Sequence, residues 1–196
     1  MTDKDTKLLP KLMTGLENTL LVASPALMDT PWENTVIYIC SHSDEGTMGV
    51  VINRPLEDIT FEEIAKDLEI PRSSIGHDPI IYSGGPVEVN RGFVLHDDGY
   101  QHESTMKLAP HINLSATSDI VGAIAQGTAP ESLNFCLGYA GWSGGQLEQE
   151  LVENSWLTLP ADTDILYNTP AHKRHAACLK KLGIDLARIS APMGSA

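Results

Sequence analysis

A serine in a glycine-rich setting is the first residue of this chain whose surroundings suggest chemistry. Ser143 lies at the centre of a G-x-S-x-G pattern that follows an apolar run and precedes a helix-like run. Where a strand turns sharply into a helix, such a serine hydroxyl is exposed above the helix N-terminus as a nucleophile. Asp162 or Asp164 and His172 or His175 could then act as the acid and the base of a hydrolase.

Other features of the chain count against that hydrolase. The strands expected before Ser143 pair as hairpins, whereas a nucleophile of this kind stands on a sheet of parallel strands. The sequence also has no HGGG-type segment that would form an oxyanion hole. A serine that caps a helix within a tight glycine turn explains Ser143 without catalysis, and we favour that interpretation.

Two clusters contain residue types that bind metals. His172, His175 and Cys178 recur at i, i+3 and i+6 on the expected final helix, and a second cluster combines residues 96–98 (His-Asp-Asp) with residues 102–103 (His-Glu). The first cluster lacks a fourth ligand, and the second reads as the polar tip of a hairpin. We therefore predict no metal site and no cofactor, and His96 stays only as an alternative catalytic residue.

Six residues at expected strand ends and in the glycine-rich segment are candidates for binding a ligand or a partner. An arginine beside glycine can hold a carboxylate or phosphate through its planar guanidinium, and aromatic side chains supply apolar contact area. The alternative is that the arginines bond loop carbonyls or pair with carboxylates. The candidates are Asn53, Arg54, Arg91, Tyr139, Trp142 and Gln146.

The elements that must position these residues follow a pattern typical of the α+β class. Strands come in pairs before and between helices, which predicts a mixed, mainly antiparallel sheet flanked by helices. Thr60 and Glu63 form a capping box that opens one helix, and Gly127 ends another. The expected strands are 19–23, 35–40, 48–52, 80–82, 92–96, 112–114, 133–137, 156–159 and 165–167, and the expected helices begin near residues 60, 117, 143 and 169.

Composition narrows the class of partner. The 13 lysines and arginines stand against 26 aspartates and glutamates, so the formal net charge is −13. Such a surface repels nucleic acid and anionic lipid, and we expect neither as a direct partner.

The apolar runs of the sequence are shorter than the about 20 residues of a membrane helix, and the three cysteines are expected to be buried free thiols. We predict a cytoplasmic protein of one domain, residues 1–196, in which residues 1–14 form a loose tail.

Several sequence blocks in fixed order resemble the AlgH/YqgE family of bacterial proteins. The blocks are Leu21–Pro25, Gly49–Pro55, Tyr82–Val87, Arg91–His96 and Gly138–Trp142 followed by Gly145–Glu148. The resemblance implies one α+β domain whose large sheet is partly closed as a barrel, without an established activity or catalytic residues. The chain departs from the family pattern at Ser143, where another small residue is usual, and near its end, where a family histidine is lacking.

These observations favour a binding or regulatory protein over an enzyme. Our leading hypothesis is a non-enzymatic protein that binds a partner or a small ligand, with the glycine-rich segment as its surface. One alternative is a hydrolase that uses Ser143 or His96. Another is a transcriptional regulator that acts through protein contacts. The ligand, the partner and the oligomeric state do not follow from the sequence.

Overall fold

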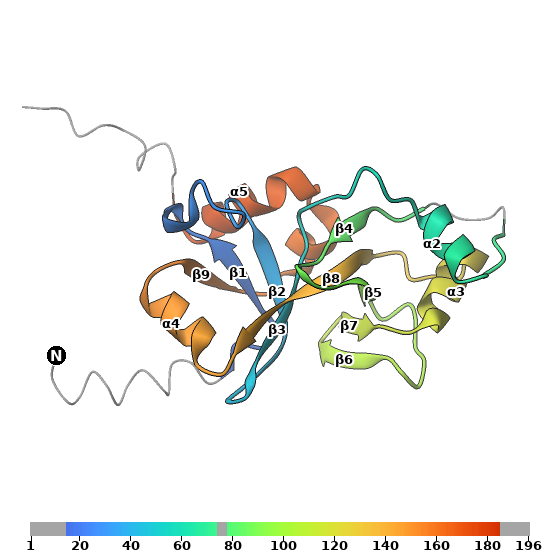
Figure 1. Cartoon of the computed structure of the whole chain (residues 1–196), viewed down its shortest axis with the longest axis horizontal. Helices are drawn as coiled ribbons and strands as arrows, with labels where there is room; N and C mark the ends of the chain where they lie inside the picture. Colours follow the sequence, from blue (N-terminus) through green and yellow to red (C-terminus); the bar gives the residue numbers. More distant parts are fainter. Residues whose placement is uncertain (1–14, 74–77, 185–196) are drawn as a thin grey trace, which may run out of the picture.

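A computed structural model describes residues 15–73 and 78–184 of the chain (Figure 1). Within those residues the strands form a nine-stranded sheet that curls into a half-barrel flanked by helices, which confirms the predicted α+β class. Its order is β6-β7-β5-β8-β3-β2-β1-β9, and β4 pairs with β8 beside this path. The expected tail at residues 1–14 lies outside the described residues.

The strands and helices have the following bounds. The strands are β1 (Thr19–Ala23), β2 (Val36–Ser43), β3 (Gly46–Val51), β4 (Ile81–Ser83), β5 (Val87–His96), β6 (Met106–Ala109), β7 (Ile112–Ser115), β8 (Leu133–Ser143) and β9 (Trp156–Pro160). The helical segments are η1 (Pro25–Leu27), α2 (Phe61–Asp67), α3 (Ser118–Gln126), α4 (Gln146–Val152), η2 (Asp164–Asn168) and α5 (Ala171–Lys181).

Strand β8 joins the two halves of the sheet. Its last four residues pair with β3, from Ala140 opposite Gly49 to Ser143 opposite Gly46. Its earlier residues pair with β5 in antiparallel fashion and with β4 in parallel fashion. The glycine-rich segment is therefore strand as far as Ser143, and the predicted turn is confined to the two residues after it. The sequence suggested a turn because glycines are unusual in a strand interior.

The glycines of β8 are explained by a close approach of two backbone segments. Gly84 donates its N–H to the Leu137 carbonyl at 2.7 Å and accepts from the Val51 N–H at 2.8 Å, so it lies between β3 and β8. A Cβ on Gly84 would lie 2.3 Å from the Gly138 carbonyl oxygen, and Gly138 itself has φ +74°. Side chains are excluded at this crossing, because two backbones pass within contact distance of each other.

Two predictions of local structure are wrong, one because of a distant contact and one because of a nearby carboxylate. The expected hairpin between β4 and β5 does not form, because the crossing at Gly84 directs β4 into a parallel pairing with β8. The expected strand at 165–167 is instead part of the helical turn η2. There the Asp162 carboxylate accepts the N–H groups of Asp164 and Ile165 at 2.9 and 3.2 Å, which stabilises a turn where apolar residues alone suggested a strand.

Helices α2 and α3 cover the face of β5 and β8 at one end of the sheet (Figure 1). The predicted capping box of α2 is confirmed, since Thr60 Oγ1 accepts from the Glu63 N–H while Glu63 accepts from the Thr60 N–H at 2.9 Å. Helix α3 ends at Gly127 in a left-handed conformation, as predicted. The apolar sides of both helices pack against Phe135 and Val94. This end of the sheet holds the groove described below.

Candidate functional site

Ser143 lies at the exposed end of β8 and does not cap α4. The N-cap of α4 is Gly145, with φ +78°, so the predicted serine cap is wrong. The Ser143 hydroxyl instead donates to Gln146 Oε1 at 3.2 Å, and the Ser143 N–H donates to the same oxygen at 3.1 Å. The side chain of Gln146 thus holds the serine hydroxyl, and no side chain caps the N-terminus of α4.

Two of the residues proposed as acid and base for Ser143, Asp162 and His175, make other contacts. Asp162 forms an ion pair with Lys181, which lowers the pKa of that carboxyl, and it caps the η2 turn. His175 Nε2 contacts the Ala23 carbonyl at 2.9 Å, which ties α5 to β1. Neither side chain forms a hydrogen bond with Ser143. A serine nucleophile needs a base within hydrogen-bond reach, and this serine has none among the described residues.

Trp142 lies inside the molecule. Only 7% of its surface is exposed, and its ring packs edge-on against Trp156 with centroids 6.3 Å apart. The indole N–H groups of both tryptophans donate to Glu150 Oε2, at 2.9 and 2.8 Å, while Gln146 donates to Glu150 Oε1 at 3.0 Å. Trp142, which the sequence suggested for a binding surface, therefore belongs to an internal cluster that holds α4 against the sheet.

Glu150→Ala is expected to lower the free energy of unfolding by about 2–4 kcal/mol, because two largely buried indole N–H groups lose their acceptor and each costs about 1–3 kcal/mol when left unpaired. The measurement is urea unfolding monitored by tryptophan fluorescence. Glu153→Ala, one turn further along, is the control and should change the stability by less than about 0.5 kcal/mol. Equal effects of the two substitutions would contradict the role assigned to Glu150.

The other strand-end candidates also make contacts within the protein. Asn53 accepts the Val36 N–H at 2.9 Å and donates to the Asn34 carbonyl at 2.8 Å. Arg54 donates to the Glu33 carbonyl at 3.1 Å and to Thr35 Oγ1 at 2.7 Å. Tyr139 packs edge-on against Phe93 at 5.8 Å. The six candidates are therefore not gathered into one surface, although a binding role for each stays a prediction.

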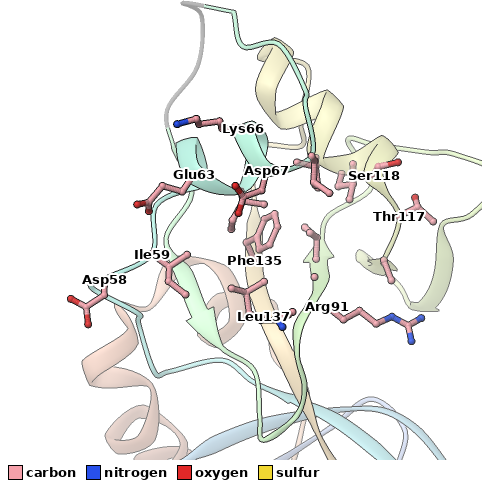
Figure 2. Close-up of a pocket in the computed structure, with 18 residues that line it drawn as sticks. Asp58, Ile59, Glu63, Lys66, Asp67, Arg91, Thr117, Ser118, Phe135 and Leu137 are labelled. Atoms are coloured by element: carbon pink, nitrogen blue, oxygen red, sulfur yellow. The ribbon is translucent and has the colours of Figure 1, made fainter.

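Arg91 is the candidate that borders a groove. The groove has a volume of about 820 Å³ and lies between α2 and α3, above β5 and β8. Its floor is apolar, and Figure 2 shows Phe135 and Leu137 pointing into it from β8. Ile64 on α2 and Ile120 on α3 form parts of the two walls. An apolar hollow of this volume with polar groups at its rim is the usual form of a binding site.

The two sides of the groove differ in charge. Asp58, Glu63 and Asp67 line the side of α2, together with Lys66 (Figure 2). Arg91 lies on the other side with Thr117 and Ser118, at the start of α3. The Arg91 guanidinium is already paired with Glu88 at 2.9 Å. The rim therefore carries carboxylates in excess, and its one arginine is neutralised by a neighbour.

A wide bulge in β5 forms the rim around Arg91. Val87 pairs with Tyr139 and Gly92 with Leu137, so the residues from Glu88 to Arg91 oppose Gly138 alone. All four of these residues are exposed, and Val89 remains 56% exposed. Bulges of this kind redirect side chains, and they are frequent beside functional sites.

Exposed apolar side chains concentrate at the same place. Ile59 and Leu68 line the groove from α2 and are 36% and 48% exposed. Val87 and Val89 are also exposed apolar residues, on the bulge that contributes Asn90 and Arg91 to the groove lining. Contiguous exposed apolar surface with a polar rim is typical of sites that bind another molecule.

A second serine, Ser115, is paired with a histidine but is closed to substrate. His96 Nε2 lies 3.0 Å from Ser115 Oγ, and its Nδ1 lies 2.8 Å from the Asp97 carbonyl. Both residues have no exposed surface. Because Nδ1 must donate to that carbonyl, Nε2 accepts from the serine hydroxyl in the neutral ring. Without access for a substrate, this pair stabilises the contact of β5 with β7 and does not support the hydrolase alternative.

Burial lowers the pKa of His96 below its ordinary value of about 6.5, against the opposing influence of the Asp97 carbonyl and the charges of Asp97 and Asp98. The unfolded chain then binds this proton more readily than the folded chain does. We therefore expect stability to fall as the pH drops below about 6.5 toward the folded pKa.

Urea unfolding between pH 8 and pH 5 tests this expectation by comparing the wild type with His96→Gln, which should lose part of the pH dependence. His172→Gln removes an exposed histidine and serves as the control. Parallel stability curves for the wild type and His96→Gln would contradict the assignment.

No group of three or more histidine, cysteine, aspartate or glutamate side chains within residues 15–73 and 78–184 is placed to hold a metal ion. The three cysteines are free and buried, as predicted, and burial raises the pKa of the Cys178 thiol to about 11. In the same part of the chain no helix is long and apolar enough to span a membrane.

Comparison with known proteins places these features in a family. The AlgH-like family model matches residues 20–187, which is most of the chain. The chain belongs to the AlgH-like family. It is 46% identical to a UPF0301 protein of Saccharophagus degradans, over 93% of this chain and 89% of that one. It is 44% identical to a UPF0301 protein of Hahella chejuensis, over 94% and 98% of the two chains.

Solved structures agree with the AlgH-like fold. The solution structure of the AlgH protein from Pseudomonas aeruginosa superposes with a TM-score of 0.76 at 41% identity, covering 94% of this chain and 97% of that chain. A crystal structure of a Corynebacterium diphtheriae protein matches with a TM-score of 0.66 at 19% identity, covering 84% and 86%, and so shares the fold. The resemblance inferred from the sequence blocks is thereby confirmed, including the curled sheet.

One buried residue that stabilises the fold was not predicted from the sequence. Arg174, which reads as part of a charged helix surface, is 3% exposed inside the half-barrel. Its guanidinium donates to the Ile52 carbonyl, to Asn134 Oδ1 at 2.8 Å and to the Thr169 carbonyl at 2.9 Å. It also lies over the Tyr82 ring at 5.3 Å. Its spacing of four residues from buried Cys178 on α5 was the pattern that could have revealed it.

Proposed function

We propose that this protein is a non-enzymatic binding protein, and that the groove between α2 and α3 holds a segment of a partner protein. The observation that carries the proposal is a groove of about 820 Å³ with an apolar floor, bordered by the exposed apolar side chains of Ile59 and Leu68 and by the exposed β5 bulge. A small ligand would be enclosed by its pocket, whereas surface that extends past the hollow suits a longer chain.

The net charge and the cysteines support the remaining parts of the proposal. A regulatory effect, if the protein has one, would act through this contact and not through DNA, since the net charge of −13 repels phosphate. We place the protein in the cytoplasm, which is supported by the three free, buried cysteines. Arg91 contributes to binding of the partner at the groove rim, whereas Trp142 supports the fold.

Titration with Nile red, an uncharged apolar dye, tests whether the groove binds apolar groups. The double variant Ile59→Gln/Leu68→Gln should weaken dye binding by about tenfold, because burial of each apolar side chain contributes on the order of 1 kcal/mol. Met28→Gln/Val152→Gln removes two apolar side chains of similar exposure elsewhere and is the matched control. The same affinity for both double variants would contradict the proposal.

A further inference from the structure

The charges at the groove rim indicate what kind of partner the groove accepts. Within the described part of the chain, the carboxylates of Asp58 and Asp67 make no hydrogen bond or ion pair. Both line the groove from the side of α2, and both residues are exposed. Of the other exposed carboxylates, Asp98 is paired with His111, and Glu88 at the rim is paired with Arg91. The rim therefore presents unpaired negative charge next to an apolar floor.

The positive groups of the groove do not offset this charge. Arg91 is held by Glu88 within the bulge, and its guanidinium lies over the Phe93 ring at 5.1 Å. Lys66 is a single cation on a side of the groove that carries three carboxylates. The whole chain adds to the effect with its net charge of −13. An anionic ligand would thus meet repulsion, whereas a cationic one is attracted from a distance.

We propose that the occupant of the groove is a basic, amphipathic segment of a partner protein, with apolar side chains on Leu68 and Leu137 and lysine or arginine beside Asp58 and Asp67. This inference rests on the proposed function and adds to it the charge of the partner. Apolar anchors supply most of the affinity at such an interface, and the charged rim selects the partner and speeds association.

Selection from a displayed library of random 12-residue peptides against the wild-type protein tests the inference. Peptides that bind should combine at least two large apolar residues with lysine or arginine. Each selected peptide is then titrated against two double variants. Asp58→Asn/Asp67→Asn should weaken its binding by about 3- to 10-fold, since each exposed charge pair contributes modestly. The wild-type affinity should also fall as salt rises from low to physiological concentration.

Matched controls separate a specific rim from a generally acidic protein. Glu17→Gln/Asp44→Asn neutralises two exposed carboxylates outside the groove and should leave the affinity within about twofold of the wild type. Equal weakening by both double variants would overturn the inference, because the attraction would then come from the overall charge.

Other outcomes distinguish the inference from the proposed function. Selected peptides that are neutral or acidic, and that lose affinity in Ile59→Gln/Leu68→Gln, would overturn the basic partner while the groove remained the binding site. Peptides that bind equally to both apolar double variants would overturn both. Self-association in sedimentation that is abolished by Leu68→Gln would replace the partner segment with a second copy of this chain.

Discussion

Arg174→Ala is expected to lower the free energy of unfolding by about 3–5 kcal/mol. The arginine donates to buried oxygens from three parts of the chain, at Ile52, Asn134 and Thr169. Without it these acceptors lose their donor, each at a cost of about 1–3 kcal/mol, and a cavity opens between α5 and the sheet. The loss is offset in part because a desolvated cation is also removed, which is the burial that lowers the pKa of this group.

Chemical unfolding followed by circular dichroism measures the effect of Arg174→Ala. Arg174→Lys should be intermediate, because a single ammonium cannot reach all of these oxygens in the geometry of a guanidinium. Lys173→Ala changes the exposed neighbour and should shift stability by less than about 0.5 kcal/mol. A loss for Arg174→Ala no larger than that of Lys173→Ala would show that Arg174 does not tie α5 to the sheet.

The second large effect is expected at the glycine crossing. Gly84→Ala should destabilise the protein by at least about 3 kcal/mol, because the new Cβ would lie 2.3 Å from the Gly138 carbonyl oxygen and 2.9 Å from Cys136 Cβ. Backbone at the junction of β3 and β8 would have to separate to relieve these contacts. The overlap cannot be removed by a side-chain rotation, since the Gly138 oxygen belongs to the main chain.

Thermal unfolding of Gly84→Ala is best compared with Gly122→Ala in the interior of α3. A Cβ at Gly122 meets nothing within 4 Å, so that substitution should raise stability by about 0.5–1 kcal/mol through the helix propensity of alanine. Opposite signs at these two glycines are the expected result. A Gly84→Ala protein that melts at the wild-type temperature would contradict the close crossing.

Local features of the fold could be predicted from the sequence because their causes are local. The hairpin of β2 and β3 follows from β-branched runs around a turn, and the capping box of α2 follows from Thr60 and Glu63. The left-handed end of α3 follows from Gly127. Each of these depends on residues within a few positions of one another.

Features that depend on distant pairings were not predictable in this way. The course of β8 to Ser143 depends on β3, which is about ninety residues earlier in the chain. Gly84 could be recognised as special, but only its contact with Gly138 explains why it directs β4 away from a hairpin. Charged residues are usually exposed, and the burial of Arg174 depends on acceptors from two distant segments, at Ile52 and Asn134.

The groove could be predicted from the sequence only in part. Its helices and Arg91 were expected, but the hollow arises only when α2 and α3 pack over β5 and β8. The predicted surface around Trp142 was drawn to the glycine-rich segment because aromatic residues there resemble an interface. In the structure Trp142 packs against α4 and Tyr139 packs against Phe93, and the groove lies at the other end of β8.

The central claim, that the groove binds a partner segment, is tested most directly by a methyl-detected NMR titration of the protein with a selected peptide. The methyl groups of Ile59, Leu68 and Ile120, which line the groove, should show the largest shifts and intermolecular contacts with the peptide. Those of Val152 on α4 should stay in place. Saturable peptide binding that shifts Val152 and leaves the groove methyl groups unmoved would contradict the account.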